Sequence, residues 1–307
     1  MNALAASCGP VRLSACPRLA LAALALLALH AARAGARHVY AVEANEEAAE
    51  AARAAVAEAG FADRVTVLDG YSTEVTLPEP VDLVVHEIFG EVAGAEGVVA
   101  AIADAAARHM VPLPSAEPSA RPLSVPARAR SLVAPAEFPP AAYFESLPLP
   151  MISAPGATVL KLPGLPRSLL LAPAATFEDL DFAAAAPHAA HDVSLSFVAV
   201  RDGLLRGLLV HIELEMSARA APTQSGGGSG EADEAENEPD VSSARPGSHW
   251  PNVFLLLPEP ADVTAGTRVL VSASARLGGE KPSYNFHVSL LEEGAAEPRE
   301  LGSVGYP

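Results

Sequence analysis

Residues 82–97 of the chain read DLVVHEIFGEVAGAEG, an apolar run followed by a glycine-containing loop with glutamates at positions 87 and 96. The run Leu83–Val85 predicts a β-strand, and the glycines after it predict a loop. Because a guanidinium group is planar and carries five N–H donors, two carboxylates approaching from different sides can hold it through paired hydrogen bonds. Glu87 and Glu96 are therefore a candidate clamp for arginine. The alternative is that both are solvated loop residues, as most surface glutamates are.

A second strand-like segment, His38–Asn45, lies upstream and contains an acid, Glu43, close to its end. An Ala/Glu-rich helix follows, for which Asn45 is a suitable N-cap and Gly60 a suitable C-cap. An acid at the end of the second strand of a Rossmann-like unit can accept hydrogen bonds from the ribose hydroxyls of a nucleotide cofactor. Glu43 is the candidate for this position. The alternative is a carboxylate that only caps the start of the helix.

Two further segments carry the remaining candidate residues. Residues 64–75 read RVTVLDGYSTEV, a short strand followed by a turn that contains Ser72 and Thr73. Far downstream, Ser248-His249-Trp250 holds the one tryptophan of the chain and precedes an apolar strand and turn at 253–260. The His-Trp pair is informative because of its order in the chain, after the segment with two glutamates.

Taken together, these segments resemble the protein arginine methyltransferase family. Glu87 and Glu96 match the spacing of the family's double-Glu loop, here residues 87–97, and Ser248-His249-Trp250 is similar to its Thr-His-Trp loop. The resemblance implies an α/β fold with a Rossmann-like class I methyltransferase domain, followed by a β-barrel domain. It also implies S-adenosyl-L-methionine as the cofactor and arginine side chains of proteins as the methyl acceptors.

The resemblance assigns roles to the residues around the acceptor. Glu87 and Glu96 would hold the guanidinium group and leave one nitrogen oriented toward the methyl donor. His249 would accept or relay the departing proton, or brace a glutamate, although a structural loop histidine fits the sequence equally well. Trp250 would lie beside the arginine pocket.

The resemblance also assigns roles on the cofactor side. Glu43 would bind the ribose hydroxyls. Ser72 and Thr73 would contact the adenine ring, at positions where many family members carry a Val-Glu pair. No metal is expected, because the two cysteines, Cys8 and Cys16, have no metal-binding spacing and form no disulfide framework.

The N-terminal segment departs from the family pattern. Family members begin with a strand and a Gly-rich loop near a helix N-terminus, whereas residues 1–25 contain Gly9 as their only glycine. We therefore expect that the first strand and the glycine loop have been lost, or that the start of the gene has been misassigned. The expected domains are an atypical segment 1–25, a Rossmann-like domain 26–112 truncated at its N-terminus, and a β-barrel domain 113–307.

The same segment also imitates a secretory signal. Arg12 and Arg18 precede an apolar run at 19–29, and Ala32-Arg33-Ala34 offers a small-residue cleavage site. A secreted protein, with residues 1–34 as its signal peptide, is thus the alternative to a cytoplasmic or nuclear one. The apolar run is too short to span a membrane.

The second half of the chain predicts β structure. The stretch 220–246 joins a Gly/Ser-rich part to an acidic run and predicts a disordered insert. Residues 109–140 are rich in Pro and Ala and predict an extended connection between the domains. Thr176–Ala190 is too short and Ala-rich to predict as the helical arm through which family members dimerise, so a homodimer stays open. Strand patterns occur at 193–200, 208–216, 253–257, 269–275 and 284–291.

Length, hydrophobic fraction and net charge limit the classes of partner that the chain can bind. A chain of 307 residues, 50% of them hydrophobic, can bury the cores of two domains. The formal charge of −17 disfavours a direct nucleic-acid partner and favours Arg-rich substrates such as histone tails or Gly/Arg-rich segments. Three functions stay open: an arginine methyltransferase, impaired if the glycine loop is lost; an inactive relative that binds Arg-rich segments; and a secreted binding protein.

Overall fold

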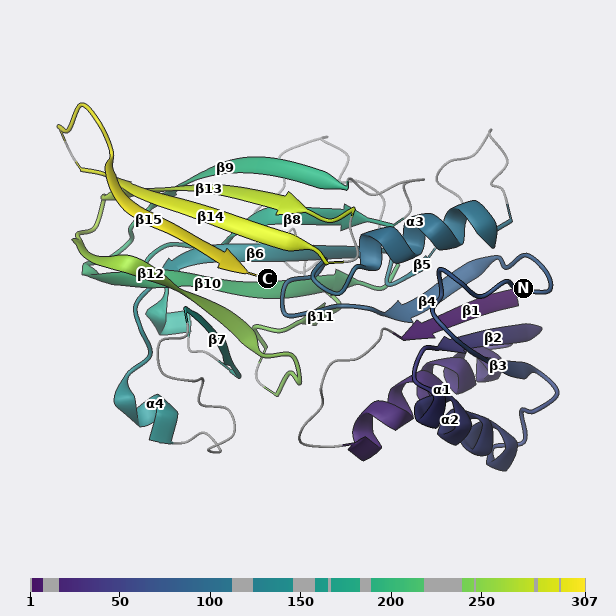
Figure 1. Cartoon of the computed structure of the whole chain (residues 1–307). Coiled ribbons are helices and arrows are strands. Elements are labelled where there is room, and N and C mark those ends of the chain that lie inside the picture. Colours follow the sequence, from purple (N-terminus) through teal and green to yellow (C-terminus); the bar gives the residue numbers. More distant parts are fainter. Residues whose placement is uncertain are drawn as a thin grey trace, which may run out of the picture.

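The computed structural model describes residues 2–7, 17–111, 124–145, 158–164, 167–182, 189–217, 239–245, 247–278, 281–292 and 294–306. They form a parallel sheet with helices on its faces, beside two antiparallel sheets (Figure 1). Within these residues, no helix is both long enough and apolar enough to cross a membrane.

The first domain alternates strands and helices. Its five strands are parallel and lie in the order β3-β2-β1-β4-β5. Helices α1 and α2 pack on one face of the sheet through small side chains such as Ala28 and Ala52, while α3 covers the opposite face (Figure 1). This is the Rossmann-like arrangement that alternating strand and helix signals predict. The elements are β1 (Asn2–Ser7), α1 (Pro17–Arg33), β2 (His38–Glu43), α2 (Glu46–Glu58), β3 (Val65–Asp69), β4 (Leu83–Glu87), α3 (Val98–Arg108) and β5 (Ser124–Val125).

Helix α2 begins and ends where the sequence predicts. The Asn45 side chain accepts a hydrogen bond of 2.9 Å from the backbone N–H of Ala48, which is an N-cap interaction. At the other end, Gly60 follows the last turn with a φ of +76°, a conformation that glycine adopts without strain. These end signals are local, which is why the sequence alone locates them.

The strand expected to be missing is present. β1 lies at the centre of the parallel sheet, where Ala3 pairs with Val39 of β2 on one side and with Leu83 of β4 on the other. Its sequence, NALAAS, hides it because Ala, Asn and Ser have low strand propensity. The expected domain start at residue 26 is therefore wrong, since β1 and the beginning of α1 precede it. The segment 8–16, in which the glycine loop was expected to be lacking, lies outside the described residues.

The end of the first domain also differs from the expected residue 112. β5 (Ser124–Val125) pairs with β4 and so belongs to the parallel sheet. The stretch 109–140 is therefore more than an extended connection, because it contains β5 and then β6 (Arg128–Ala136) of the second domain. Alanine and proline in this stretch obscured both strands, whose partners lie elsewhere in the chain.

The second domain consists of two antiparallel sheets. One has the order β7-β12-β10-β6-β8, with β11 paired to β10, and the other has the order β15-β14-β13-β9. The expected β-barrel is not closed in the described part of the chain, because the consecutive strands β8 and β9 pair with β6 and β13 instead of with each other. The elements after β6 are α4 (Ala141–Glu145), β7 (Val159–Leu162), a 3₁₀ turn (Arg167–Leu169), β8 (Ala175–Asp181), β9 (Ala190–Val198), β10 (Gly203–Glu215), β11 (Val241–Ser242), β12 (Asn252–Val263), β13 (Arg268–Arg276), β14 (Ser283–Leu291) and β15 (Arg299–Tyr306).

Three expectations about this domain change. The end of the insert is ordered, since β11 (Val241–Ser242) pairs with the end of β10, whereas 218–238 lies outside the described residues. The turn expected at the end of 253–260 is absent, because β12 continues to Val263. The segment Thr176–Ala190, left without a prediction, supplies most of β8 and the first residue of β9.

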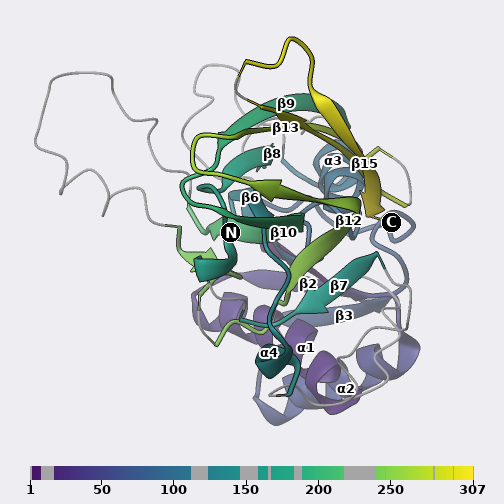
Figure 2. The same ribbon diagram turned by 90° about the vertical axis from the view of Figure 1, so that its left-hand side faces the viewer.

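One hydrophobic core runs through both domains, which lie one above the other in Figure 2. The double-Glu loop contributes Ile88, Phe89 and Val92, each at most 3% exposed. These side chains belong to the same cluster as Phe177 and Phe286 of the antiparallel sheets. The loop that carries the two glutamates is therefore held at the junction of the domains.

Candidate active site

The candidate site lies at the carboxyl ends of the parallel strands. Glu87 is the last residue of β4 and is in register with Ser7, the last residue of β1, while Glu43 ends β2 on the other side of β1. Strands β2 and β3 follow β1 on one side of the sheet, whereas β4 and β5 are added on its other side. The topological switch point therefore lies between β1 and β4. Ligands of open α/β sheets bind outside the strand ends at such a point. Glu43 and Glu87 flank β1 and are thus separated by roughly 10 Å, two strand spacings.

The two glutamates of the double-Glu loop lie close enough to influence each other. Burial raises the pKa of Glu87 to about 7. The pKa of Glu96 is also raised to about 7, mainly by burial and to a smaller extent by the charges of Glu87 and Glu91, while the charge of Lys161 lowers it. Both side chains are only partly exposed. A cation bound by these two partly buried carboxylates would lower the pKa of each.

A third carboxylate of the loop, Glu91, already has partners. Lys161 Nζ of β7 lies 2.7 Å from one of its oxygens, and the Tyr306 hydroxyl of β15 donates a 2.7 Å hydrogen bond to the other. Burial alone would raise the pKa of Glu91, but these two bonds outweigh it and lower the pKa. Glu91 is therefore a tether between the loop and the second domain, and its pKa is lowered, whereas the pKa values of Glu87 and Glu96 are raised.

Glu43 and the turn after β3 meet at the same edge. Glu43 is 6% exposed, and its carboxylate accepts a 2.9 Å hydrogen bond from the N–H of Asn45. Burial raises its pKa, against the effect of the backbone N–H groups. The N–H of Gly70 donates to the Glu43 carbonyl, which joins the turn to the end of β2. In that turn Ser72 is half-buried and Thr73 is exposed.

An arginine that the sequence analysis did not select holds this turn in place. The Arg108 guanidinium, at the end of α3, donates to the carbonyl oxygens of Ser72 (2.7 Å) and Val75 (3.0 Å) and pairs with Asp104 at i−4. The i, i+4 spacing of Asp104 and Arg108 was a signal for their own pairing. Nothing local indicates the 33-residue reach to Val75.

No protein-family model and no curated protein matches the sequence. The structure, by contrast, is similar to that of Arabidopsis thaliana protein arginine methyltransferase 10, with a TM-score of 0.72 and 18% identity over 99% of this chain and 88% of that one. It is also similar to a chain of the Trypanosoma brucei PRMT1 enzyme-prozyme heterotetrameric complex with AdoHcy, with a TM-score of 0.68 and 17% identity over 99% and 89% of the two chains. This chain has the protein arginine methyltransferase fold.

In this protein arginine methyltransferase fold, the Ser-His-Trp segment precedes β12. Trp250 packs partly against the shared core, and the exposed His249 ring lies on it with 4.0 Å between ring centroids. The structure thus keeps Glu87 and Glu96 partly buried in one loop, where the charge of Glu87 acts on Glu96, and leaves His249 on the surface beside Trp250. The roles of these four residues remain predictions.

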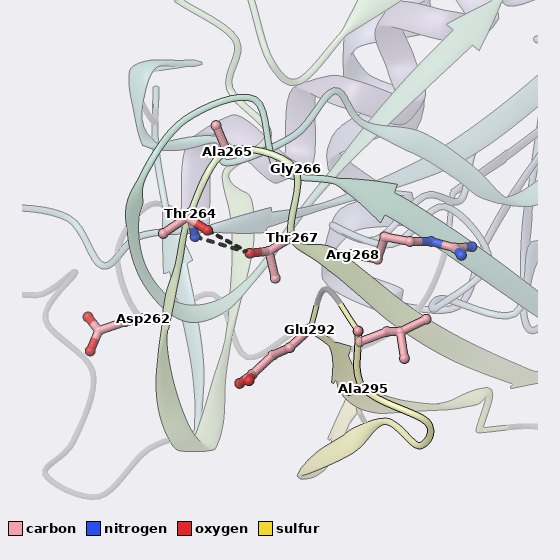
Figure 3. Close-up of a pocket in the computed structure, with 10 residues that line it drawn as sticks. Asp262, Thr264, Ala265, Gly266, Thr267, Arg268, Glu292 and Ala295 are labelled. Atoms are coloured by element: carbon pink, nitrogen blue, oxygen red, sulfur yellow. Dashed lines mark hydrogen bonds between the residues drawn. The ribbon is translucent and has the colours of Figure 1, made fainter.

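A cavity of about 730 Å³ lies elsewhere, between the β12–β13 turn and the segment after β14 (Figure 3). Its lining includes Asp262, Arg268 and Glu292, and Thr264 and Thr267 form hydrogen bonds at its rim. None of the candidate site residues lines it. The candidate site is therefore defined by the strand ends and the double-Glu loop, and the cavity plays no part in it.

Proposed function

We propose that this chain transfers a methyl group from S-adenosyl-L-methionine to arginine side chains of proteins. The observation that carries the proposal is the partly buried pair Glu87 and Glu96: Glu87 ends β4 beside the switch point of the parallel sheet, and its charge acts on Glu96 in the same loop. The fold shared with protein arginine methyltransferases supports it.

Glu87 and Glu96 would act on the acceptor. Arginine keeps its proton at all accessible pH values, so prior deprotonation is unfavourable and the residues must work by position and charge. Two carboxylates can bind the guanidinium through charge-assisted hydrogen bonds and draw its positive charge toward the nitrogens they hold. The remaining nitrogen is then oriented for attack, which supplies proximity and electrostatic stabilisation.

The edge of the sheet fits a nucleoside cofactor. Glu43 is buried, and its partners are backbone N–H groups, so the carboxylate can also accept hydrogen bonds from ribose hydroxyls. Ser72 and Thr73 would face the adenine ring from the turn that Gly70 joins to Glu43. When bound, S-adenosylmethionine supplies a methyl group on a sulfonium sulfur. The Trypanosoma brucei complex contains AdoHcy, which supports this choice of cofactor.

His249 would receive the proton that the methylated nitrogen releases. Its ring is exposed on Trp250, so it can pass that proton to water. The acidic chain would attract Arg-rich proteins such as histone tails or Gly/Arg-rich segments. We place it in the cytoplasm or nucleus and propose that it can form a homodimer.

The second candidate is a relative that binds Arg-rich segments without methyl transfer. It is favoured by the connection between β1 and α1, residues 8–16, which has a single glycine, Gly9, where the family carries a Gly-rich loop. The third candidate, a secreted protein, implies a mature chain that starts near Gly35. Such a chain would lack both β1 and α1, and β2 and β4 would lose the strand between them.

One experiment separates the first two candidates. The purified chain is incubated with methyl-labelled S-adenosylmethionine and a Gly/Arg-rich peptide, and a Gly/Lys-rich peptide serves as the acceptor control. We expect label only in the arginine peptide, and strong loss of incorporation in Glu87→Gln and Glu96→Gln. Glu50→Gln, an exposed residue of α2, is the matched control and should keep full activity.

Binding to the arginine peptide without label transfer would favour the second candidate. Isothermal titration calorimetry with S-adenosylmethionine then shows which half of the reaction is lost. If the chain neither binds the arginine peptide nor transfers label to it, the proposal is overturned.

A further inference from the structure

A buried carboxylate of the second domain, Glu178 of β8, binds the backbone of the double-Glu loop. Glu178 is 1% exposed, and one of its oxygens accepts a 3.2 Å hydrogen bond from the N–H of Gly94. The same oxygen accepts a 2.5 Å bond from the Ser131 hydroxyl, which in turn accepts a 2.9 Å bond from the N–H of Ala93. Two consecutive loop N–H groups are thereby fixed to β6 and β8.

The other oxygen of Glu178 binds the opposite sheet. The Tyr284 hydroxyl of β14 donates a 2.8 Å hydrogen bond to it. Tyr284 and Ser131 are 4% and 0% exposed, so the network is shielded from water on both sides. A Cβ added to Gly94 would lie 2.6 Å from the Tyr284 hydroxyl and 2.7 Å from the Glu178 carboxylate, which shows how closely the loop backbone approaches the network.

A β-bulge lies next to Glu178 on β8. Ser131 pairs with Glu178, but the next residue, Leu132, pairs with Thr176, so Phe177 is the extra residue on β8. The neighbours Phe177 and Glu178 are both buried at this bulge, and regular alternation continues with the exposed Asp179 and the buried Leu180. Bulges of this kind redirect side chains beside functional sites.

The identity of the residue also argues for a role in the site. Burying a carboxylate is unfavourable unless hydrogen bonds satisfy it, and an apolar residue would usually serve a core better. All three donors to Glu178 are neutral groups. One is the backbone N–H of Gly94 in the loop, and another, the Ser131 hydroxyl, itself binds the loop N–H of Ala93. The contacts therefore serve the loop more than the core.

We infer that Glu178, Ser131 and Tyr284 are positioning residues for the arginine clamp, an inference that rests on the proposed function. The bonds reach Ala93 and Gly94, which lie between Glu87 and Glu96 in the chain, so the second domain sets the separation of the two clamp carboxylates. The tether from Lys161 and Tyr306 to Glu91 acts on the same stretch of loop.

The test compares Glu178→Gln with Asp179→Asn. Asp179 is the next residue of β8, but it is exposed and pairs with Arg128, so it serves as the control. Glu178→Gln keeps the shape of the side chain but replaces one carboxylate oxygen, an acceptor, with an amide NH₂ group, a donor. We expect it to lower the affinity for a Gly/Arg-rich peptide by about tenfold or more, with unchanged S-adenosylmethionine affinity. Asp179→Asn should change neither.

Two readouts separate positioning from general destabilisation. Hydrogen exchange of the Ala93 and Gly94 amides should become faster in Glu178→Gln, while the amides of α2 keep their protection. The pH midpoint of peptide binding should move below 7, because a looser loop leaves Glu87 and Glu96 more hydrated and farther apart. The other titratable groups that act on Glu96, or on which it acts, are Glu91, Lys161 and Tyr306. Tyr284→Phe, which removes one donor, provides a milder variant if Glu178→Gln does not fold.

Unchanged exchange of the two amides, or unchanged peptide affinity and pH midpoint in a folded variant, would overturn the inference. A wild-type chain that does not bind the arginine peptide would instead overturn the proposed function. In that event the exchange of Ala93 and Gly94 still decides whether Glu178 holds the loop.

Discussion

We expect the affinity of the chain for an arginine peptide to rise steeply between about pH 6 and about pH 8. Burial raises the pKa of Glu87 to about 7, and burial together with the charges of Glu87 and Glu91 raises the pKa of Glu96 to about 7. The guanidinium stays charged throughout this range and binds best when both glutamates are ionised. Protons on the two glutamates therefore compete with the peptide.

The size of the effect follows from these pKa values. One pH unit below such a pKa, only about one carboxyl in eleven is ionised. If both must ionise, the affinity at about pH 6 is roughly 100-fold below its limit, about 2.7 kcal/mol, and at about pH 8 it is close to that limit. In Glu96→Gln only Glu87 titrates, and since burial causes its shift, the midpoint stays near 7. The loss at about pH 6 then falls to about tenfold.

Isothermal titration calorimetry measures both the affinity for the peptide and the number of protons released on binding. Titrations in buffers of different ionisation enthalpy count the protons released on binding, which should approach two for the wild type at about pH 6 and one for Glu96→Gln. Glu50→Gln, exposed on α2, should behave like the wild type. Equal affinities at the two pH values, or binding without proton release, would refute the coupling of this pair to arginine.

Three further outcomes test the fold around the site. Asn45→Ala should lower the free energy of unfolding by about 1 kcal/mol in urea titrations, because it removes the N-cap bond to Ala48, and an unchanged value would count against that cap. Gly94→Ala should destabilise the chain by about 1–3 kcal/mol in the same assay, since its Cβ would lie 2.6 Å from the Tyr284 hydroxyl; wild-type stability would contradict the close packing. Glu87 has a raised pKa when folded, so its contribution to stability is present below about pH 4.5 and lost as the pH rises through about 7. Glu87→Gln should therefore lose less stability between these pH values than the wild type, and parallel pH curves would rule this out.

Much of the first domain follows from local signals in the sequence. The strand that ends at Glu43, the N-cap at Asn45 and the strand before Glu87 appear in the structure where the sequence predicts them. Each depends on residues that are neighbours in the chain: β-branched runs, a capping side chain, a change from apolar to polar residues. The strands 269–275 and 284–291 were found in the same way, as parts of β13 and β14.

Other elements could not be found because their stability comes from distant partners. β1 has an Ala-rich sequence that favours no strand, and it becomes one only between β2 and β4. Glu178 shares a strand face with the buried Leu180, which was a signal for burial, but the bulge at Phe177 and the bond to Gly94 depend on pairing with β6.

The sequence by itself determined which acidic residues are candidates at the ends of the parallel strands and in the loop after them. The spacing of Glu87 and Glu96, and the acid at Glu43, are properties of the chain that require no knowledge of its packing. Only the tertiary structure decided that Glu87 and Glu96 are partly buried, which raises the pKa of each to about 7. It also decided that Glu178 reaches the loop across 84 residues of sequence, because desolvation and long-range hydrogen bonds exist only once the two domains share one core.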